Sequence, residues 1–181
     1  MNGAGLFKLG QDVDEIVLNV LDPLGVAALG RPDGFTPLAL SAAWTSQVRL
    51  GTGIVGVFQR GPALLAQQAA ALTDASSGRV ALGIGASSDR MVEGWNQIPF
   101  VKPLSKVEQT VDFLRVALAG ERTDTGFKLE TAPTHETPIV LPALRGKMLE
   151  LAVNKADGSF TNFLPLAGLP KVVDGIEGAG N

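Results

Sequence analysis

The residue types best suited to bind a ligand stand just after two apolar runs of the sequence. Gly83, Gly85, Ser87 and Ser88 follow one run, and Gly146-Lys147-Met148 follows another. Backbone N–H groups and hydroxyls at the end of a buried strand can contact the polar tail or ring edge of a ligand. Unpaired N–H groups and a cation at a helix start suit an anion instead. A Gly-x-Gly pair alone does not specify a ligand, and an ordinary turn with a surface lysine explains the second segment equally well.

Three further glycines, Gly51, Gly53 and Gly56, interrupt the apolar run over residues 48–57. Glycine weakens the interior of a strand, so its presence there indicates a bulge or backbone that a ligand approaches closely. The alternative is that small residues are needed for close packing between elements. The residues alone favour neither explanation.

Other groups that could do chemistry have simpler explanations. His135, the single histidine, lies between two prolines with no partner nearby in sequence to orient it, which favours a surface role over catalysis. Asp89, Arg90, Glu93 and Trp95 could line the mouth of a site, but a solvated loop is the simpler interpretation. With one histidine and no cysteine, we expect no transition-metal site.

Length and composition limit the class of protein. A chain of 181 residues that is 45% hydrophobic and 18% charged is typical of one globular domain, here residues 1–181. A net charge of −3 and a pI near 5.1 exclude the basic footprint of a nucleic-acid-binding protein. Apolar runs are too short to span a membrane, the N-terminus does not resemble a signal peptide, and cysteine is absent. We therefore expect a cytoplasmic protein without nucleic-acid or membrane partners.

The elements that must position these residues alternate between strands and helices. Early in the chain we expect a short strand at 6–9, a helix over 12–21 begun by a capping box of Asp12 and Glu15, and a helix over 36–45 with Thr36 as its N-cap. Residues 22–36 are broken by proline and glycine and leave room for at most a brief strand.

The most regular pattern is a strand, a helix and a second strand over residues 48–85. Both apolar runs, 48–57 and 79–85, are typical of strands that are buried on both faces. Gly61-Pro62 opens the intervening helix, Ser76-Ser77-Gly78 ends it, and its core-facing stripe is Leu64, Leu65, Ala69 and Leu72. This unit predicts a parallel sheet with a right-handed crossover.

The remainder of the chain continues the alternation. We expect a loop over 86–102, a helix that begins at Pro103 and ends before Gly120, and a small hairpin or excursion at 126–130. A strand over 138–144, a helix over 146–155, a strand from 159 and a weak helix over 170–176 follow. This order fits either a doubly wound sheet or a (β/α) barrel, and periodicity does not choose between them.

A resemblance to a known family makes the choice. Residues 45–53 (TSQVRLGTG), 62–66 (PALLA) and 77–85 (SGRVALGIG) resemble the bacterial luciferase-like monooxygenase family, most closely its coenzyme F420-dependent branch. Pro138-Ile139-Val140, Ala143-Leu144, Gly146-Lys147-Met148 and Ala156-Asp157-Gly158 continue that pattern in the same order. The resemblance covers about residues 36–175 and implies a TIM-type (β/α) barrel, with deazaflavin (F420) or FMN bound at the C-terminal ends of the strands.

The chain departs from this pattern in two ways. A complete barrel takes about 250 residues, so we expect an incomplete barrel of about six parallel strands that lacks the last strands. The open strand edges and the resemblance both predict self-association as a homodimer. Residues 22–36 are also shorter than the corresponding family segment, so the catalytic acid or base stays unknown.

The resemblance also implies a cofactor site. The ring would lie against a bulge at Gly53, Ile54 and Val55, the connecting tail beside Ser87, and the phosphate near Gly146 and Lys147. The complete expected set of cofactor-binding residues is Gly53, Ile54, Val55, Gly85, Ser87, Ser88, Ala143, Gly146, Lys147 and Met148.

Two functions remain open at this point. The first is an oxidoreductase or monooxygenase in which reduced F420 or FMN transfers hydride, or activates oxygen, toward a small organic substrate. The alternative is a non-catalytic, truncated barrel that self-associates and binds the cofactor weakly or not at all.

Overall fold

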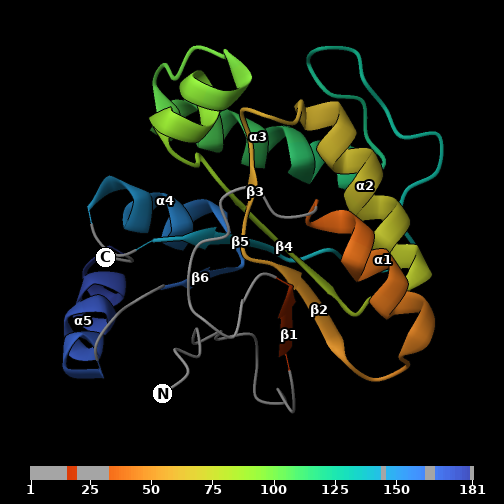
Figure 1. Ribbon diagram of the computed structural model, residues 1–181, viewed down its shortest axis with the longest axis horizontal. Helices are drawn as coiled ribbons and strands as arrows, with labels where there is room; N and C mark the ends of the chain where they lie inside the picture. The colour runs from red at the N-terminus through yellow and green to blue at the C-terminus, as the bar shows by residue number, and fades with distance from the viewer. Residues whose placement is uncertain (1–15, 20–32, 144–145, 162–165, 180–181) are drawn as a thin grey trace.

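Strands and helices alternate along the chain in a computed structural model, which describes residues 16–19, 33–143, 146–161 and 166–179 (Figure 1). The elements in chain order are β1 (Ile16–Asn19), α1 (Phe35–Trp44), β2 (Arg49–Thr52), β3 (Val55–Gly56), α2 (Pro62–Ala75), β4 (Val80–Gly85), a π-helical turn (Arg90–Gly94), α3 (Pro103–Leu118), β5 (Ile139–Pro142), α4 (Lys147–Lys155), β6 (Gly158–Phe160), a 3₁₀ turn (Leu166–Gly168) and α5 (Leu169–Ala179).

The strands form one parallel sheet. Its order is β1-β2-β4-β5-β6, and the short strand β3 pairs with the end of β4. Each pairing is parallel, so the C-terminal ends of the strands meet at one edge of the sheet. All six residues of β4 are buried, as its continuous apolar run predicts.

The two faces of the sheet carry side chains of different size. Val80, Leu82 and Ile84 of β4 belong to the larger core cluster, which contains residues of the helices such as Leu65 and Leu114. Ala81 belongs instead to a small cluster that, besides it, contains only Val140 and Phe160 as buried members. The bulky residues of β4 therefore face the helices, and its alanine and glycines face the other side of the sheet.

The helices follow one another around the outer face of the sheet. α1 packs on α2, α2 on α3, α3 on α4 and α4 on α5, as the arc of helices in Figure 1 shows. α2 begins at Pro62, and α2 and α3 are followed by Gly78 and Gly120, both with positive φ. A glycine in this conformation ends a helix at little steric cost. The predicted bounds of these two helices are confirmed.

Arg79 holds the N-terminal edge of the sheet together. Its guanidinium donates hydrogen bonds to the carbonyl oxygens of Ala42, Thr45, Val48 and Ser76. One side chain thereby satisfies carbonyl groups at the ends of both α1 and α2, which helices leave unpaired. The arginine in the pattern SGRVALGIG is therefore a structural residue at the N-terminal edge of the sheet, opposite the edge where the strands end.

Three local predictions are wrong. Residues 16–19 form β1, not the middle of a helix, because they pair with β2 in the register Ile16 with Arg49. α1 begins at Phe35 after Gly34, and the side chain of Asp33, not that of Thr36, accepts from the first N–H groups of the helix. Leu64 is 47% exposed, although the other three members of the predicted stripe are buried.

Smaller differences concern irregular segments. The predicted strand over 48–57 is divided into β2 and β3, and part of the predicted loop after β4 forms the π-helical turn. Residues 126–130 form no strand; the N–H of Thr123 donates to the carbonyl oxygen of Phe127 in a tight turn. The predicted strand at 6–9, the capping box and most of 22–36 lie outside the described residues.

The predicted fold class is confirmed. The described residues form parallel strands separated by helices, with β2, β4 and β5 at the centre of the sheet. Within these residues, none of the helices is both long enough and apolar enough to cross a membrane.

Candidate functional site

A bulge separates β2 from β3 at the C-terminal edge of the sheet. Gly51 pairs with Ala81 and Val55 with Ile84, so four steps along this strand correspond to three along β4. One extra residue is thus inserted between Thr52 and Val55, where the Gly53–Ile54 peptide is cis. The glycine-rich segment is a bulge, as the resemblance implied.

The side chain of Thr52 replaces the missing backbone pairing at this bulge. Its Oγ1 donates to the carbonyl oxygen of Gly83 at 2.7 Å and accepts from the N–H of Gly83 at 2.8 Å. A Cβ on Gly83 would lie 1.9 Å from the backbone oxygen of Thr52. Gly83 is therefore glycine because the two strands approach closely, and the expectation that its N–H is free for a ligand is wrong.

Gly85 brings three strand ends together. A Cβ at this position would lie 3.0 Å from both Ile54 Cδ1 and Pro142 Cγ. The bulge, the end of β4 and the end of β5 thus meet around one glycine, with Ala143 directly after Pro142. Val55 differs, because its side chain is 3% exposed and belongs to the core cluster. Only its backbone can face a ligand at this edge.

The two serines after β4 have different surroundings. Ser87 has a φ of +67° and is half-buried, and its hydroxyl lies 3.4 Å from Met91 Sδ and 3.5 Å from Gln59 Nε2. Ser88 is exposed, and its carbonyl oxygen accepts from the N–H groups of Met91 and Val92 in the π-helical turn. Ser87 is the serine that the structure holds close to the strand ends.

Gln59 is a candidate residue that the sequence reasoning missed. Its carboxamide lies over Gly56, where a Cβ would be 2.0 Å from Gln59 Oε1. Gly56 pairs with Gly85, so this amide lies beside the strand ends. Its Oε1 is buried and has no hydrogen-bond partner among the described residues. The signal available in the sequence was Gly56, a glycine whose spatial neighbour the sequence does not show.

The helix that follows β5 provides a second polar feature at the same edge. Gly146 precedes α4 with a φ of +61°, its carbonyl oxygen accepts from the N–H groups of Leu149 and Glu150, and a Cβ on it would meet open space. Lys147 is exposed beside it. Free N–H groups at such a helix start suit an anion. Met148 packs against the core instead, so its side chain is not brought to this surface.

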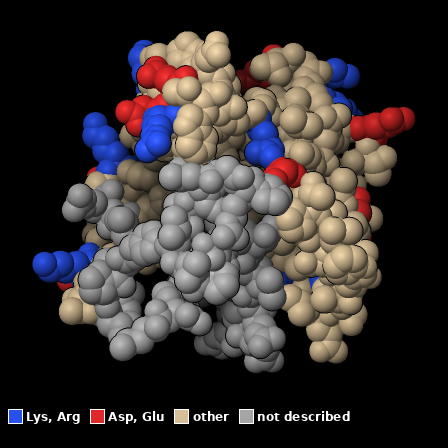
Figure 2. All heavy atoms as spheres, in the orientation of Figure 1, with Lys and Arg blue, Asp and Glu red and all other residues tan. Residues whose placement is uncertain are grey.

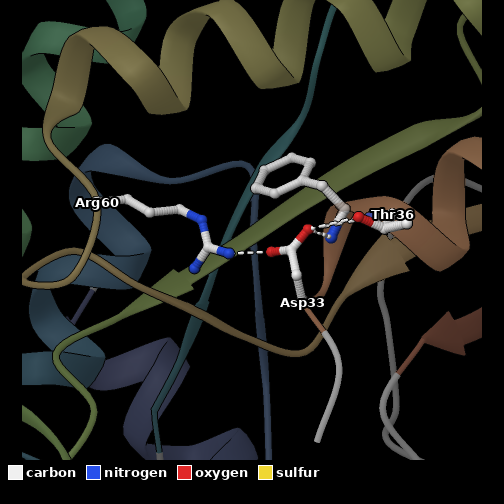
Figure 3. A network of polar contacts seen from close by, with 4 residues as sticks. Asp33, Thr36 and Arg60 are labelled. Atoms are coloured by element: carbon white, nitrogen blue, oxygen red, sulfur yellow. Dashed lines mark hydrogen bonds and ion pairs between the residues drawn. The ribbon is translucent and has the colours of Figure 1, made fainter.

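A polar network ties two loops together at this edge (Figure 3). Asp33 Oδ2 accepts from the N–H groups of Phe35 and Thr36 and from Thr36 Oγ1, while Asp33 Oδ1 pairs with Arg60 Nη2. The guanidinium of Arg60 also lies 5.7 Å from the centre of the Phe35 ring. Burial by itself raises the pKa of the Asp33 carboxyl, but the hydrogen bonds from Thr36, the charge of Arg60 and the N–H of Phe35 outweigh it. The pKa of Asp33 therefore lies below its ordinary value.

Three further titratable residues considered as candidates interact with neighbouring parts of the chain. His135 is exposed and lies beside Thr134 and the turn at Gly78, at the end of α2, which is a surface position as predicted. Glu93 accepts from the N–H of Phe100, and Asp89 from the N–H of Arg90. Across the ranges that the structure describes, no three His, Cys, Asp or Glu side chains gather as a metal-binding group.

Comparison with known protein families shows to which family this chain belongs. The model of the luciferase-like monooxygenase family matches residues 21–180, which include every described element from α1 to α5. The chain belongs to the luciferase-like monooxygenase family. The family resemblance found in the sequence is thereby confirmed.

Relatives and solved structures agree with this assignment. A Mycobacterium tuberculosis protein named as a putative coenzyme F420-dependent oxidoreductase, Rv3520c, is 33% identical in an alignment 162 residues long, which covers 77% of this luciferase-like chain and 45% of the relative. The F420-dependent tetrahydromethanopterin reductase of Methanopyrus kandleri superposes with a TM-score of 0.64 at 24% identity, over 83% of this chain and 51% of that one. The FMN complex of a type II Baeyer-Villiger monooxygenase from Pseudomonas putida gives a TM-score of 0.67 at 18% identity, over 82% and 48%. These two structures show the fold.

This luciferase-like chain spans less than half the length of the curated relatives with which it shares 30% to 33% identity, between 40% and 45%. The described residues that fit a flavin-type group are those at the strand ends. The side chain of Ile54 lies against Gly85, the hydroxyl of Ser87 lies beside the amide of Gln59, and Gly146 offers an unobstructed helix start. The side chains of Val55 and Met148 pack into the core instead, and Ala143 is 4% exposed.

Proposed function

We propose that this chain forms the cofactor-binding part of an oxidoreductase that uses F420 or FMN on a small organic substrate, and that residues 1–181 form one barrel-type domain. The observation that carries the proposal is the bulge at Gly53–Ile54, packed around Gly85 at the C-terminal edge of a luciferase-like sheet. When bound, the cofactor supplies hydride transfer or oxygen activation. The residues of this chain bind it, orient it and exclude water.

The bulge is proposed to support the cofactor ring. A bulge leaves backbone groups outside the regular ladder, and Gly53 adds no side chain between them and a ligand. The hydrogen bonds of Thr52 to Gly83 hold this backbone in place from the β4 side. Gly53 and Ile54 then act through backbone and side-chain contact, and Val55 through its backbone alone.

The start of α4 is proposed to hold the cofactor phosphate. The N–H groups of the first turn and the positive end of the helix dipole favour an anion there, and Lys147 adds a cation. Open space around Gly146 leaves the backbone accessible. Gly146 and Ser87 lie at the same edge, because each follows one of two neighbouring parallel strands.

We further propose that the protein is a cytoplasmic homodimer that associates through α1 and α2. α1 contains no charged residue, yet its Leu40 and Trp44 are 47% and 77% exposed, and Leu64 of the adjacent α2 is 47% exposed. The surface over α1 is largely uncharged in Figure 2. Exposed apolar side chains on neighbouring helices are typical of surfaces that another protein copy covers.

Titration of the purified protein with each cofactor tests the proposed function. Binding of F420 or FMN should change the absorbance and fluorescence of the cofactor and raise the midpoint of urea unfolding, because a ligand that binds the folded state stabilises it. Riboflavin, which has the FMN ring without the phosphate, is the control and should bind more weakly than FMN. A folded protein that changes neither cofactor spectrum would favour the non-catalytic alternative.

A further inference from the structure

The hydroxyl of Ser87 has an unusual set of neighbours. Its oxygen faces the amide nitrogen of Gln59 at 3.5 Å, and its proton points to the thioether sulfur of Met91 at 3.4 Å. A thioether is a weak acceptor, so the hydroxyl can rotate and donate its hydrogen bond to a better acceptor at little cost. An amide N–H is a donor only, so it turns the hydroxyl proton away from Gln59. The hydroxyl is thereby prepared to donate to a ligand oxygen.

The carboxamide of Gln59 packs directly over Gly56. A Cβ at position 56 would lie 2.0 Å from its Oε1, so any residue other than glycine there would displace the carboxamide from this position. The same Oε1 is buried without a partner in the described part of the chain. A buried acceptor left unpaired costs free energy. The amide is therefore placed beside Ser87 by packing over Gly56, with no described hydrogen bond to its own oxygen.

The backbone of Ser87 is also held in a rare conformation. Its φ of +67° lies in the left-handed region, which serine adopts at a cost. The carbonyl of Gly85, two residues before it, accepts the N–H of Val57, which ties this turn to the β3 side. Residues in such conformations cluster at ligand sites, where the surrounding structure maintains them.

We propose that Gln59 is a positioning residue of the cofactor site, which orients the Ser87 hydroxyl as a donor to a carbonyl or phosphate oxygen of the cofactor. The inference rests on the proposed function, because it needs a ligand with acceptor oxygens at this edge. It adds a residue, Gln59, and gives Gly56 a reason: Gly56 makes room for the amide. The hydrogen bond between Gln59 and Ser87, which is long in this structure, shortens when the cofactor binds.

Removal of the amide should weaken cofactor binding without unfolding the protein. Gln59→Ala and Ser87→Ala should each raise the dissociation constant for the bound cofactor about three- to tenfold, the effect of one hydrogen bond. The matched control is Gln68→Ala, because Gln68 on α2 also has a buried Oε1 without a described partner. It should leave the dissociation constant unchanged. Urea unfolding without cofactor measures the stability of each variant separately.

Two further variants test how Gln59 orients the Ser87 hydroxyl. Gly56→Ala should weaken binding as much as Gln59→Ala, because the new Cβ displaces the amide, and it should have no further effect when added to Gln59→Ala. Gln59→Glu places an acceptor beside the hydroxyl, which turns its proton away from the ligand. Binding to this variant should be weaker than to Gln59→Ala near pH 7 and should recover as the glutamate is protonated near its ordinary pKa of about 4.3.

The outcomes separate this inference from the proposed function. Binding by the unaltered protein together with equal dissociation constants for Gln59→Ala and Gln68→Ala would overturn the inference and leave the proposed function intact. Additive effects of Gly56→Ala and Gln59→Ala would also overturn it. If the unaltered protein binds neither F420 nor FMN, the proposed function fails and the inference fails with it.

Discussion

Arg60, in the loop between β3 and α2, forms an ion pair with Asp33 at the start of α1 (Figure 3). The same carboxylate caps α1 through the N–H groups of Phe35 and Thr36. One side chain thus begins a helix and holds a neighbouring loop. The ion pair and the capping hydrogen bonds both lie at the C-terminal edge of the sheet, where the candidate site lies.

The two tasks of Asp33 are separable by mutation. Asp33→Ala removes the cap and the ion pair and should lower the free energy of unfolding by about 0.5–2 kcal/mol. Arg60→Met removes the ion pair and keeps the cap, so it should cost less, about 1 kcal/mol at most for a partly exposed pair. Urea unfolding of both variants makes the comparison. Equal losses would show that capping contributes little.

The free energy of unfolding should depend on pH through the protonation of the Asp33 carboxyl. Because the pKa of this carboxyl is lower in the folded protein than its ordinary value of 3.8, its contribution is complete above that value and is lost as the pH falls below it. An asparagine side chain also caps helices well, so Asp33→Asn isolates the charge. The difference in unfolding free energy between the two proteins should be constant from pH 7 to 5 and shrink below about pH 4. A constant difference down to pH 3 would contradict the assignment.

The hydroxyl of Thr52 should stabilise the bulge. Thr52→Val keeps the shape of the side chain but leaves the N–H and carbonyl groups of Gly83 unpaired in a buried place, which should cost about 1–3 kcal/mol. Thr52→Ser keeps the hydroxyl and is the control, with a smaller loss. Thermal unfolding measures both. If serine and valine cost the same, the lost methyl packing and not the hydrogen bonds would explain the effect.

The proposed phosphate contact predicts a graded effect of charge at α4. Lys147→Ala should weaken cofactor binding by a few tenths to about 1 kcal/mol, because an exposed lysine is screened by solvent, and Lys147→Glu should weaken it further. Lys128→Ala is the control, since Lys128 is exposed in the segment after α3. Gly146→Val should block the approach of the phosphate, but the positive φ at this position also strains any other residue. Its unfolding midpoint must therefore be measured beside its affinity.

The homodimer proposal predicts that a charge on α1 prevents association. Trp44→Glu should convert a dimer to a monomer in sedimentation velocity, with little change in unfolding at low protein concentration, because Trp44 is 77% exposed. Trp95→Glu is the matched control, since Trp95 is exposed on the turn after β4. A monomer before any substitution would refute this proposal.

Local patterns in the sequence determined much of the regular structure. The helical spacing of apolar residues and the Pro and Gly residues at their ends predicted α2 and α3, and the apolar run of β4 predicted a strand buried on both faces. These features depend on residues within a few positions of one another. The family resemblance, carried by the same segments, supplied the fold class and the strand edge at which a ligand is proposed to bind.

Only the tertiary structure decided what depends on partners far apart in the sequence. Residues 16–19 form a strand because β2 pairs with them, although a helix pattern was also present. Gly83 and Gly85 look alike in the sequence, but one is pressed against Thr52 and the other separates Ile54 from Pro142. Gln59 became a candidate only once Gly56 was seen beneath its amide. Periodicity and propensity report the local chain, whereas register, close approach and burial are set by the packing of distant segments.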